Sequence, residues 1–296
     1  MCKNVKPAFY YKTKEKCKYL FTKYIFSRPC RIETRFFEMK ILCIGDVTGM
    51  GGVKLLCDRL WKFRKEKGID FCVVNAENAA FITGASAEIA DMLFKAGADV
   101  LTGGNHTLRN KAVYSYIDHQ PYMLRPINFT EEATGSGYCI TDMCGYRVMV
   151  INAMGNVHID PVLDAPYSYI ERALRREEGR YDLAVMDIHA EATGEKLAIA
   201  HAFDGRINVI FGTHTHVPTA DMQVLPRGTG YVTDLGMCGE SGGILGMNAE
   251  GVVKRMRSHL PLKFEAASGA PVADGVIFEL SGVNFAVTDI ERVKIR

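Results

Sequence analysis

Two of the eight histidines in the 296-residue chain lie two positions apart in the motif GTHTH, residues 212–216. The motif follows the apolar run INVIF, residues 207–211, which is typical of a buried strand. If the strand continues through the motif, its two-residue alternation places His214 and His216 on the same side. Two imidazoles on one side can bind a metal ion, and a polar loop end is the alternative interpretation.

Other apolar runs also end in polar residues that could bind a metal. In open α/β sheets, ligands bind at the edge formed by the carboxyl ends of the strands. Each polar residue alone is weak evidence, because Asp and Asn at strand ends commonly cap helices or form turns. Five separate strands that each deliver a nitrogen or oxygen ligand to one edge indicate a binding site. The candidate ligands are Asp46, Glu77, Asn78, Asn105, His189, His214 and His216.

The types of these side chains indicate the kind of metal. Histidine nitrogen mixed with carboxylate and amide oxygen, without a nearby cysteine, suits Mn, Fe or Zn bound for catalysis. Seven ligands exceed what one ion needs, whereas two ions that share Glu77 would use them all. Paired ions of this kind stabilise the attacking and leaving oxygens of an in-line displacement at phosphorus.

The order of the motifs resembles that of the calcineurin-like metallophosphoesterases, and more narrowly of their YmdB-like branch, bacterial phosphodiesterases that act on cyclic nucleotides. The resemblance covers residues 39–296. It implies an α/β fold, a two-sheet sandwich flanked by helices in four layers (α/β/β/α). The motifs that carry it are GD (45–46), NAEN (75–78), GGNH (103–106), DIHAE (187–191) and GTHTH (212–216).

The resemblance also implies a function. We expect hydrolysis of phosphodiester bonds in cyclic nucleotides (2′,3′- and/or 3′,5′-linked), including RNA-derived ones, by in-line attack of a metal-bridging hydroxide. His106 would be the catalytic general acid. Fe or Mn is expected at both metal positions, with Zn as the alternative. One ion would be bound by Asp46, Glu77, Asn78 and His216, and the other by Glu77, Asn105, His189 and His214.

The chain departs from the general pattern of the superfamily at several positions. The usual D-x-H opening is Asp46-Val47-Thr48, and the usual bridging aspartate is Glu77. Both departures belong to the YmdB-like branch. Thr107 follows His106 where an acidic residue is usual, so we expect His106 to lack an orienting carboxylate. Glycines 49, 51 and 52 are interpreted as allowing the backbone to approach a phosphate.

Several rival functions fit the motifs less well. Amidohydrolases carry HxH after their first strand, and β-lactamase-like hydrolases need HxHxDH, so neither fits GTHTH. A regulatory protein that binds metal or nucleotide without turnover is a second alternative. Such a protein would be expected to lack some ligands or the acid, whereas all ligand positions and His106 are present here. A phosphomonoesterase of the same fold is a third.

The alternation of apolar runs and helical patterns predicts one domain with a mixed, two-sheet core. Residues 40–47, 71–78, 98–106, 181–191 and 207–216 are expected strands. Residues 137–155, 222–236 and 275–293 are expected hairpins, and 238–247 is an expected glycine-rich loop. The expected helices are 53–67, 85–96, 110–118, 164–178, 194–203 and 249–260.

Charge is distributed unevenly along the chain. Residues 1–38 carry a balance of +7, so the remainder carries −5 within a net charge of +2. We expect this basic segment to lie outside the fold, with 39–296 as the domain, because Met39 opens directly onto a strand. A misjudged start codon is one explanation of the segment, and a nucleic-acid or membrane-surface arm is an alternative.

The composition is typical of a soluble globular protein, with 48% hydrophobic and 24% charged residues. No run approaches the roughly 18 consecutive apolar residues of a membrane span. The nine cysteines have no CxxC spacing. We therefore expect a cytoplasmic protein with few or no disulfides, and a homo-oligomer is an open alternative to a monomer.

Overall fold

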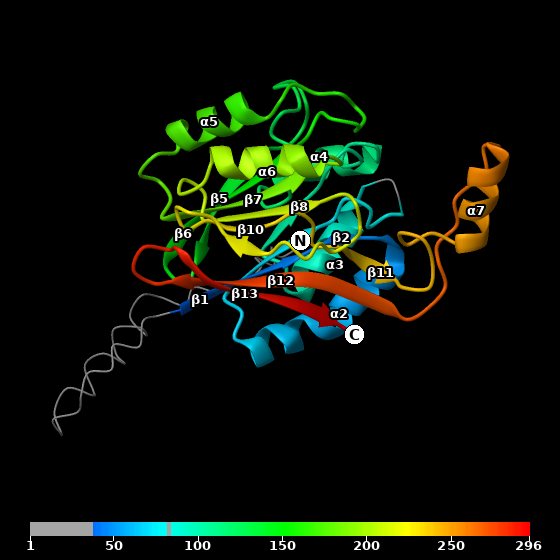
Figure 1. The fold of residues 1–296 in the computed structure, drawn as a ribbon, viewed down its shortest axis with the longest axis horizontal. Helices are drawn as coiled ribbons and strands as arrows, with labels where there is room; N and C mark the ends of the chain where they lie inside the picture. Colours follow the sequence, from blue (N-terminus) through cyan, green and yellow to red (C-terminus); the bar gives the residue numbers. More distant parts are fainter. Residues whose placement is uncertain (1–37, 82–83) are drawn as a thin grey trace, which may run out of the picture. The chain divides into compact units, whose positions relative to one another are not determined.

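A computed structural model describes residues 38–81 and 84–296, which form two β-sheets with helices on their outer faces (Figure 1). In this part of the chain the first sheet has seven strands: β1 (Glu38–Ile44), β2 (Asp46–Val47), β3 (Phe71–Asn75), β4 (Val100–Thr102), β11 (Met237–Glu240), β12 (Pro271–Ser281) and β13 (Val287–Ile295). The second has six: β5 (Tyr138–Met143), β6 (Tyr146–Met154), β7 (Leu183–His189), β8 (Val209–Thr213), β9 (Gln223–Val224) and β10 (Gly230–Val232). The helices are α2 (Gly49–Lys67), α3 (Ala87–Ala96), the 3-10 turn η1 (Lys111–Val113), α4 (Tyr114–His119), α5 (Tyr167–Arg176), α6 (Thr193–Ala202) and α7 (Ala249–Ser258).

Both sheets are mixed, as the sequence predicts. The first has the order β2-β11-β12-β1-β3-β4, with β13 beside β12, and the second has the order β5-β6-β7-β8-β10-β9. Strands β1, β3 and β4 run parallel, as do β6, β7, β8 and β10. The predicted hairpins are confirmed as the antiparallel pairs β5–β6, β9–β10 and β12–β13. The carboxyl ends of the parallel strands therefore form an edge in each sheet.

Three clusters of buried hydrophobic side chains lie between four layers and hold them together. In β1, Ile41 and Cys43 pack with Phe211 of the other sheet, whereas Leu42 and Ile44 face the helices on the opposite side. This is the two-residue alternation of a strand that is covered on both faces. The third cluster joins the second sheet to α5 and α6 through Met186, Ile188, Ile170 and Ile199. The α/β/β/α sandwich is thus confirmed.

Two of the predicted boundaries that are wrong lie where helix α2 packs on strand β11. Helix α2 begins at Gly49 rather than 53, and part of the predicted loop 238–247 is strand β11. The two elements pack closely, because a Cβ on Gly52 would lie 2.1 Å from the carbonyl oxygen of Cys238. The absence of a side chain at Gly52 therefore permits helix α2 to pack on strand β11. This role differs from the predicted one, in which glycines 49, 51 and 52 form a loop whose backbone approaches a phosphate.

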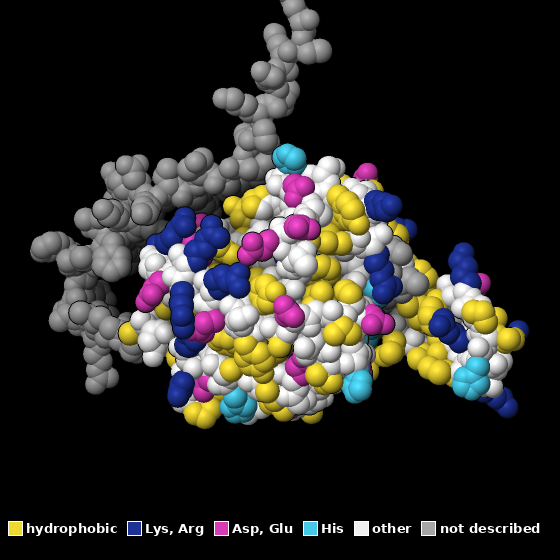
Figure 2. Space-filling view, turned by 90° about the horizontal axis from the view of Figure 1, so that it is seen from above, with side chains coloured by type: hydrophobic (Ala, Val, Ile, Leu, Met, Phe, Trp, Pro, Cys, Tyr) yellow, Lys and Arg dark blue, Asp and Glu magenta, His cyan; other side chains and the backbone are white. Residues whose placement is uncertain are grey.

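Helix α7 projects from the two sheets, and its segment carries both hydrophobic and basic side chains (Figures 1 and 2). Val253 is 46% exposed and Met256 is 73% exposed. Clustered apolar side chains at a surface are typical of contact sites, and the homo-oligomer stays a prediction. No helix in residues 38–81 and 84–296 combines the length and the apolar character that a bilayer crossing requires. Free thiols are present at Cys43, Cys57, Cys72, Cys139 and Cys238.

The predicted boundary at residue 39 lies at the limit of the described residues, and the segment 1–37 lies outside them. Strand β1 pairs with β12 from Glu38↔Ser281 to Ile44↔Gly275. A protein that begins at Met39 would lose one residue of this ladder, so we propose that residues 39–296 suffice for folding and chemistry. We expect its melting temperature and metal content to match those of the full chain. A large loss of either would show that the basic segment takes part in the fold.

Candidate metal centre

The seven predicted ligands lie at or shortly after the carboxyl ends of parallel strands. Asp46 comes two residues after β1, and Glu77 comes two residues after β3. His189 is the last residue of β7. The side chains of these three residues are buried, with exposures of 0 to 1%. Asn78 follows Glu77, Asn105 follows β4, and His214 and His216 follow β8.

The two histidines of GTHTH do not continue strand β8, so that prediction is wrong. The strand ends at Thr213, and His214 and His216 have φ values of 102° and 63°. Residues other than glycine seldom adopt this left-handed region, and such strain persists where the surrounding structure enforces it. Both imidazoles still reach the strand ends, by backbone turns rather than by strand alternation.

A buried ion pair holds this histidine loop. The ammonium group of Lys196 donates hydrogen bonds to the Thr213 carbonyl at 2.7 Å and to the Asp234 carboxylate at 2.8 Å. Asp234 also accepts a hydrogen bond from the backbone N–H of Thr215 at 3.1 Å. Lys196 and Asp234 are both fully buried. Sequence reasoning missed the pair, because its partners are 38 residues apart.

Three acceptor atoms lie near a fourth, His189 Nε2, and we call the set the acceptor cluster: Glu77 Oε1, Asn105 Oδ1, His189 Nε2 and His214 Nδ1. His189 Nε2 lies 3.1 Å from Asn105 Oδ1, 3.1 Å from His214 Nδ1 and 3.6 Å from Glu77 Oε1. Ligand atoms that share one ion at bonds of about 2.1 Å are themselves about 3.0–3.4 Å apart. The spacing is therefore close to that of a metal site.

Hydrogen bonds outside the cluster leave these ring nitrogens without protons. His214 Nε2 lies 3.1 Å from the Glu191 carboxylate, an acceptor, so the neutral ring carries its proton there. His189 Nδ1 lies 2.9 Å from the Thr213 hydroxyl, which donates its own proton to Asp187. The hydroxyl must therefore accept from His189, so the ring proton of His189 is on Nδ1. His189 Nε2 and His214 Nδ1 thus face each other with lone pairs. A cation between them would convert this repulsion into ligation.

Two buried carboxylate oxygens also lack a partner. Asp46 Oδ1 and Glu77 Oε2 accept no hydrogen bond, although both side chains are buried. Burial raises the pKa of Asp46 to about 6 and that of Glu77 to about 8, since the ionised forms lose hydration. Unpaired buried acceptors are costly, and bound cations would compensate them. The donor set therefore fits metal ions.

The second predicted ligand set is only partly assembled. Asp46 Oδ1 lies 3.8 Å from His216 Nε2, and the Asn78 amide nitrogen lies 3.2 Å from the same atom. His216 Nδ1 lies 3.2 Å from the carbonyl of Leu245, which anchors the ring from outside. Asn78 would have to turn its oxygen toward His216 to become a ligand. Within residues 38–81 and 84–296, no group of three or more His, Cys, Asp or Glu side chains is arranged so that it could hold a metal ion without rearrangement.

His106 lies beside both ligand sets. Its Nδ1 is 2.8 Å from Asn78 Oδ1 and 3.0 Å from Glu77 Oε1, and its backbone N–H donates to Glu77 Oε1 at 2.8 Å. The expectation that His106 lacks an orienting carboxylate is therefore wrong, because Glu77 takes that place. Burial, followed by the positive charge of Arg109, lowers the pKa of His106 to about 4. Sequence reasoning also missed Arg109, although it lies only three positions further along the chain.

Gly104 must lack a side chain for His189 to occupy this position. A Cβ on Gly104 would lie 2.2–2.4 Å from atoms of the His189 ring, closer than any van der Waals contact permits. We expect Gly104→Ala to displace the ring from the acceptor cluster and to weaken metal binding by about 10- to 100-fold, as when a ligand loses its support. Metal titration would measure this. Gly194→Ala is the control, since no atom lies within 4 Å of its added Cβ, and an unaffected Gly104→Ala protein would contradict the ring placement.

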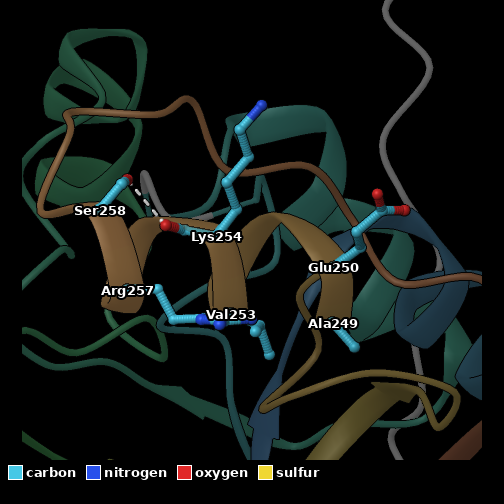
Figure 3. Close-up of a pocket in the computed structure, with 6 residues that line it drawn as sticks. All are labelled: Ala249, Glu250, Val253, Lys254, Arg257 and Ser258. Atoms are coloured by element: carbon cyan, nitrogen blue, oxygen red, sulfur yellow. Dashed lines mark hydrogen bonds between the residues drawn. The ribbon is translucent and has the colours of Figure 1, made fainter.

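The hollow along α7 is separate from this centre. Figure 3 shows its lining, which consists of Ala249, Glu250, Val253, Lys254, Arg257 and Ser258. It contains no predicted ligand, no buried carboxylate and no histidine. The chemistry that the sequence predicts therefore belongs to the strand ends.

Most of the described chain is similar to known proteins. The family model described as YmdB-like protein matches residues 42–293. The chain is 38% identical over 257 residues to the 2′,3′-cyclic-nucleotide 2′-phosphodiesterase of Bacillus subtilis (strain 168), covering 87% of this chain and 97% of that protein. It is also similar to two solved structures. One is a phosphatase from Mycoplasma pneumoniae (TM-score 0.80, 30% identity, 87% of this chain and 93% of that one), and the other is a hypothetical protein from Thermus thermophilus (TM-score 0.79, 33% identity, 86% and 98%).

Proposed function

The chain belongs to the YmdB-like protein family, and from that premise we propose that it is a metal-dependent phosphodiesterase that hydrolyses cyclic nucleotides. The acceptor cluster carries the proposal, because a set of buried and half-buried lone pairs without protons among them is suited to cations. The name of the Bacillus subtilis relative supports a 2′,3′-cyclic nucleotide as the substrate. A 3′,5′-cyclic nucleotide is the second substrate to test.

The seven proposed ligands form two sets, each of which would hold one metal ion. Glu77, Asn105, His189 and His214 would bind one ion, and Asp46, Glu77, Asn78 and His216 would bind the other. Mixed nitrogen and oxygen ligands favour Fe or Mn, with Zn as the alternative. When bound, two such ions would supply Lewis acidity to the phosphoryl oxygens and lower the pKa of a water nucleophile.

Groups of the chain itself would orient the diester and move the proton. Helix α2 begins next to a proposed ligand, because Thr48 at its start forms a backbone bridge with Asn78. The positive end of the helix would favour an anionic diester there. His106 Nδ1 is held by Asn78 and Glu77, which leaves Nε2 for the substrate. At a pKa of about 4 the ring is neutral before substrate binds. An anionic diester favours the protonated ring, and His106 would then donate that proton to the leaving oxygen.

The proposal is tested by the substrates that the full-length protein turns over. We expect hydrolysis of 2′,3′-cyclic AMP, inhibition by a chelator, and recovery with Mn²⁺ or Fe²⁺. Faster hydrolysis of a nucleoside monophosphate than of either cyclic nucleotide would favour the phosphomonoesterase. Binding of the cyclic nucleotide without hydrolysis, in protein that contains metal, would favour the regulatory alternative.

A further inference from the structure

One buried carboxylate outside the ligand sets connects the two sheets beneath the candidate metal centre. Asp187 lies in β7, two residues before His189, and is fully buried. Its Oδ2 accepts hydrogen bonds from Asn75 Nδ2 at 2.8 Å and from the Thr102 hydroxyl at 2.5 Å, both in the seven-stranded sheet. Its Oδ1 accepts one from the Thr213 hydroxyl at 2.7 Å, in its own sheet.

The Thr213 hydroxyl has only one proton, and its contacts determine where that proton points. A hydroxyl donates once and accepts twice. Thr213 Oγ1 lies 2.7 Å from Asp187 Oδ1, 3.2 Å from Asn75 Nδ2 and 2.9 Å from His189 Nδ1. Donation to His189 would leave the charged, buried Asp187 Oδ1 without a donor, which is strongly unfavourable. The proton therefore goes to Asp187, and His189 Nδ1 must donate to Thr213.

This direction of the hydrogen bonds selects the tautomer of His189. With the proton on Nδ1, the lone pair is on Nε2, which is the atom that contacts Asn105 and His214 at 3.1 Å. The opposite tautomer would place a proton where an ion must bind. A carboxylate that fixes a ligand histidine through its other nitrogen commonly strengthens metal binding.

A second set of hydrogen bonds connects the same carboxylate to the other sheet. Asn75 donates to Asp187 through Nδ2, and its Oδ1 accepts a hydrogen bond from the backbone N–H of Glu77 at 2.9 Å. The backbone at Glu77 is thereby fixed relative to β7. Asp187 is thus linked to one proposed ligand in each sheet.

We propose that Asp187 is a positioning residue that selects the metal-binding tautomer of His189 through Thr213 and fixes Glu77 through Asn75. The inference rests on the proposed function for the ligand roles of His189 and Glu77. The tautomer itself can be measured without metal or substrate, so the two proposals can fail separately.

The decisive variant is Asp187→Asn, which keeps the shape of the side chain. Its oxygen can still accept from Asn75 and Thr102, while its amide nitrogen would donate to Thr213 Oγ1. The Thr213 hydroxyl would then donate to His189 Nδ1, and the ring proton would move to Nε2. Thr213→Val removes the hydroxyl, whereas Thr213→Ser retains it. Thr102→Val is the matched control. Thr102 also donates to the Asp187 carboxylate, but its hydroxyl does not contact a proposed metal ligand.

The measurement is the long-range ¹H–¹⁵N correlation spectrum of the histidine rings in the full-length protein without metal, at about pH 8. The His189 signals are assigned by their loss in His189→Asn. We expect an Nδ1 proton in wild type, Thr213→Ser and Thr102→Val, an Nε2 proton in Asp187→Asn, and a loss of preference in Thr213→Val. Titration with Mn²⁺ alone should show about 10- to 100-fold weaker binding in Asp187→Asn and Thr213→Val, and a much smaller change in Thr102→Val.

An Nδ1 proton on His189 in both Asp187→Asn and Thr213→Val would overturn the proposal. An equal change of tautomer in Thr102→Val would overturn it as well, since general loosening of the core would then explain the effect. If Asp187→Asn does not fold, the pair Thr213→Val and Thr213→Ser decides the result. A wild-type protein with the expected tautomer but without Mn²⁺ binding would support the hydrogen-bond selection and contradict the metal centre.

Discussion

Glu77→Gln is expected to abolish metal binding and diester hydrolysis while the fold persists. The substitution preserves the size of the side chain and removes the charge that both proposed ions would share. One oxygen of Glu77 already lies 3.6 Å from His189, and the other has no hydrogen-bond partner. We expect activity and metal affinity to fall by at least about 100-fold, the upper end of the losses caused by replacing residues that only support ligands.

The same substitution should stabilise the protein when metal is absent. Burial raises the pKa of Glu77 from 4.5 to about 8, so between these values the folded state keeps a proton that the unfolded state has lost. The contribution of Glu77 to stability therefore decreases as pH rises through this window and is lowest above pH 8. Thermal unfolding of the metal-free proteins should show an advantage of Glu77→Gln that increases from about pH 4.5 to 8.

Glu177→Gln is the matched control for both measurements. Glu177 is also buried, but its carboxylate pairs with Arg180 at 2.8 Å and lies outside the ligand sets. We expect this variant to retain metal and activity. Full activity in Glu77→Gln, or a stability difference that does not change with pH, would contradict the role assigned to Glu77.

His106→Ala is expected to slow hydrolysis according to the leaving group. Diesters that release a poor alkoxide need a proton at the leaving oxygen, so we expect their turnover to fall by about 10²- to 10⁴-fold. A p-nitrophenolate leaves without this help, and the loss on p-nitrophenyl diesters should be much smaller. The measurement is the ratio of kcat/KM on 2′,3′-cyclic AMP and on bis-p-nitrophenyl phosphate.

Metal content separates this role from a structural one, because His106 contacts Glu77 and Asn78. We expect the metal content of His106→Ala to remain that of the wild type. The control is His119→Ala, whose exposed ring contacts the carbonyl of Ser115. Equal losses on both substrates, or a loss of metal, would show that His106 orients the ligands or the phosphate and does not donate the proton.

The apolar pattern of the sequence predicted the two mixed sheets, and the resemblance of its motifs implied the four layers. Apolar runs such as residues 71–75 indicate buried strands even when the partner strands are unknown. Polar residues after parallel strands of one sheet lie at one edge of that sheet. The predictions failed where distant segments determine the backbone. His214 leaves the strand because Lys196 and Asp234 hold its loop. Residues 237–240 form β11 by pairing with the distant strands β12 and β2.

The hydrogen bonds that orient the proposed ligands were likewise hidden from the sequence. Glu191 and Asp187 belong to the motif DIHAE, but only the folded chain shows that one contacts His214 and the other contacts Thr213. The contact between His106 and Glu77 joins segments 29 residues apart. Residue types alone suggest the proposed ligands, whereas the protonation of these side chains depends on neighbours that the fold supplies.

The most direct test of the two-metal account is the number of transition-metal ions per chain in the full-length protein, measured by elemental analysis together with hydrolysis of 2′,3′-cyclic AMP. We predict two Fe or Mn ions per chain, loss of hydrolysis when a chelator removes them, and recovery when they are restored. A protein that hydrolyses the cyclic nucleotide equally well with and without metal, or that binds no transition metal at all, would contradict the account.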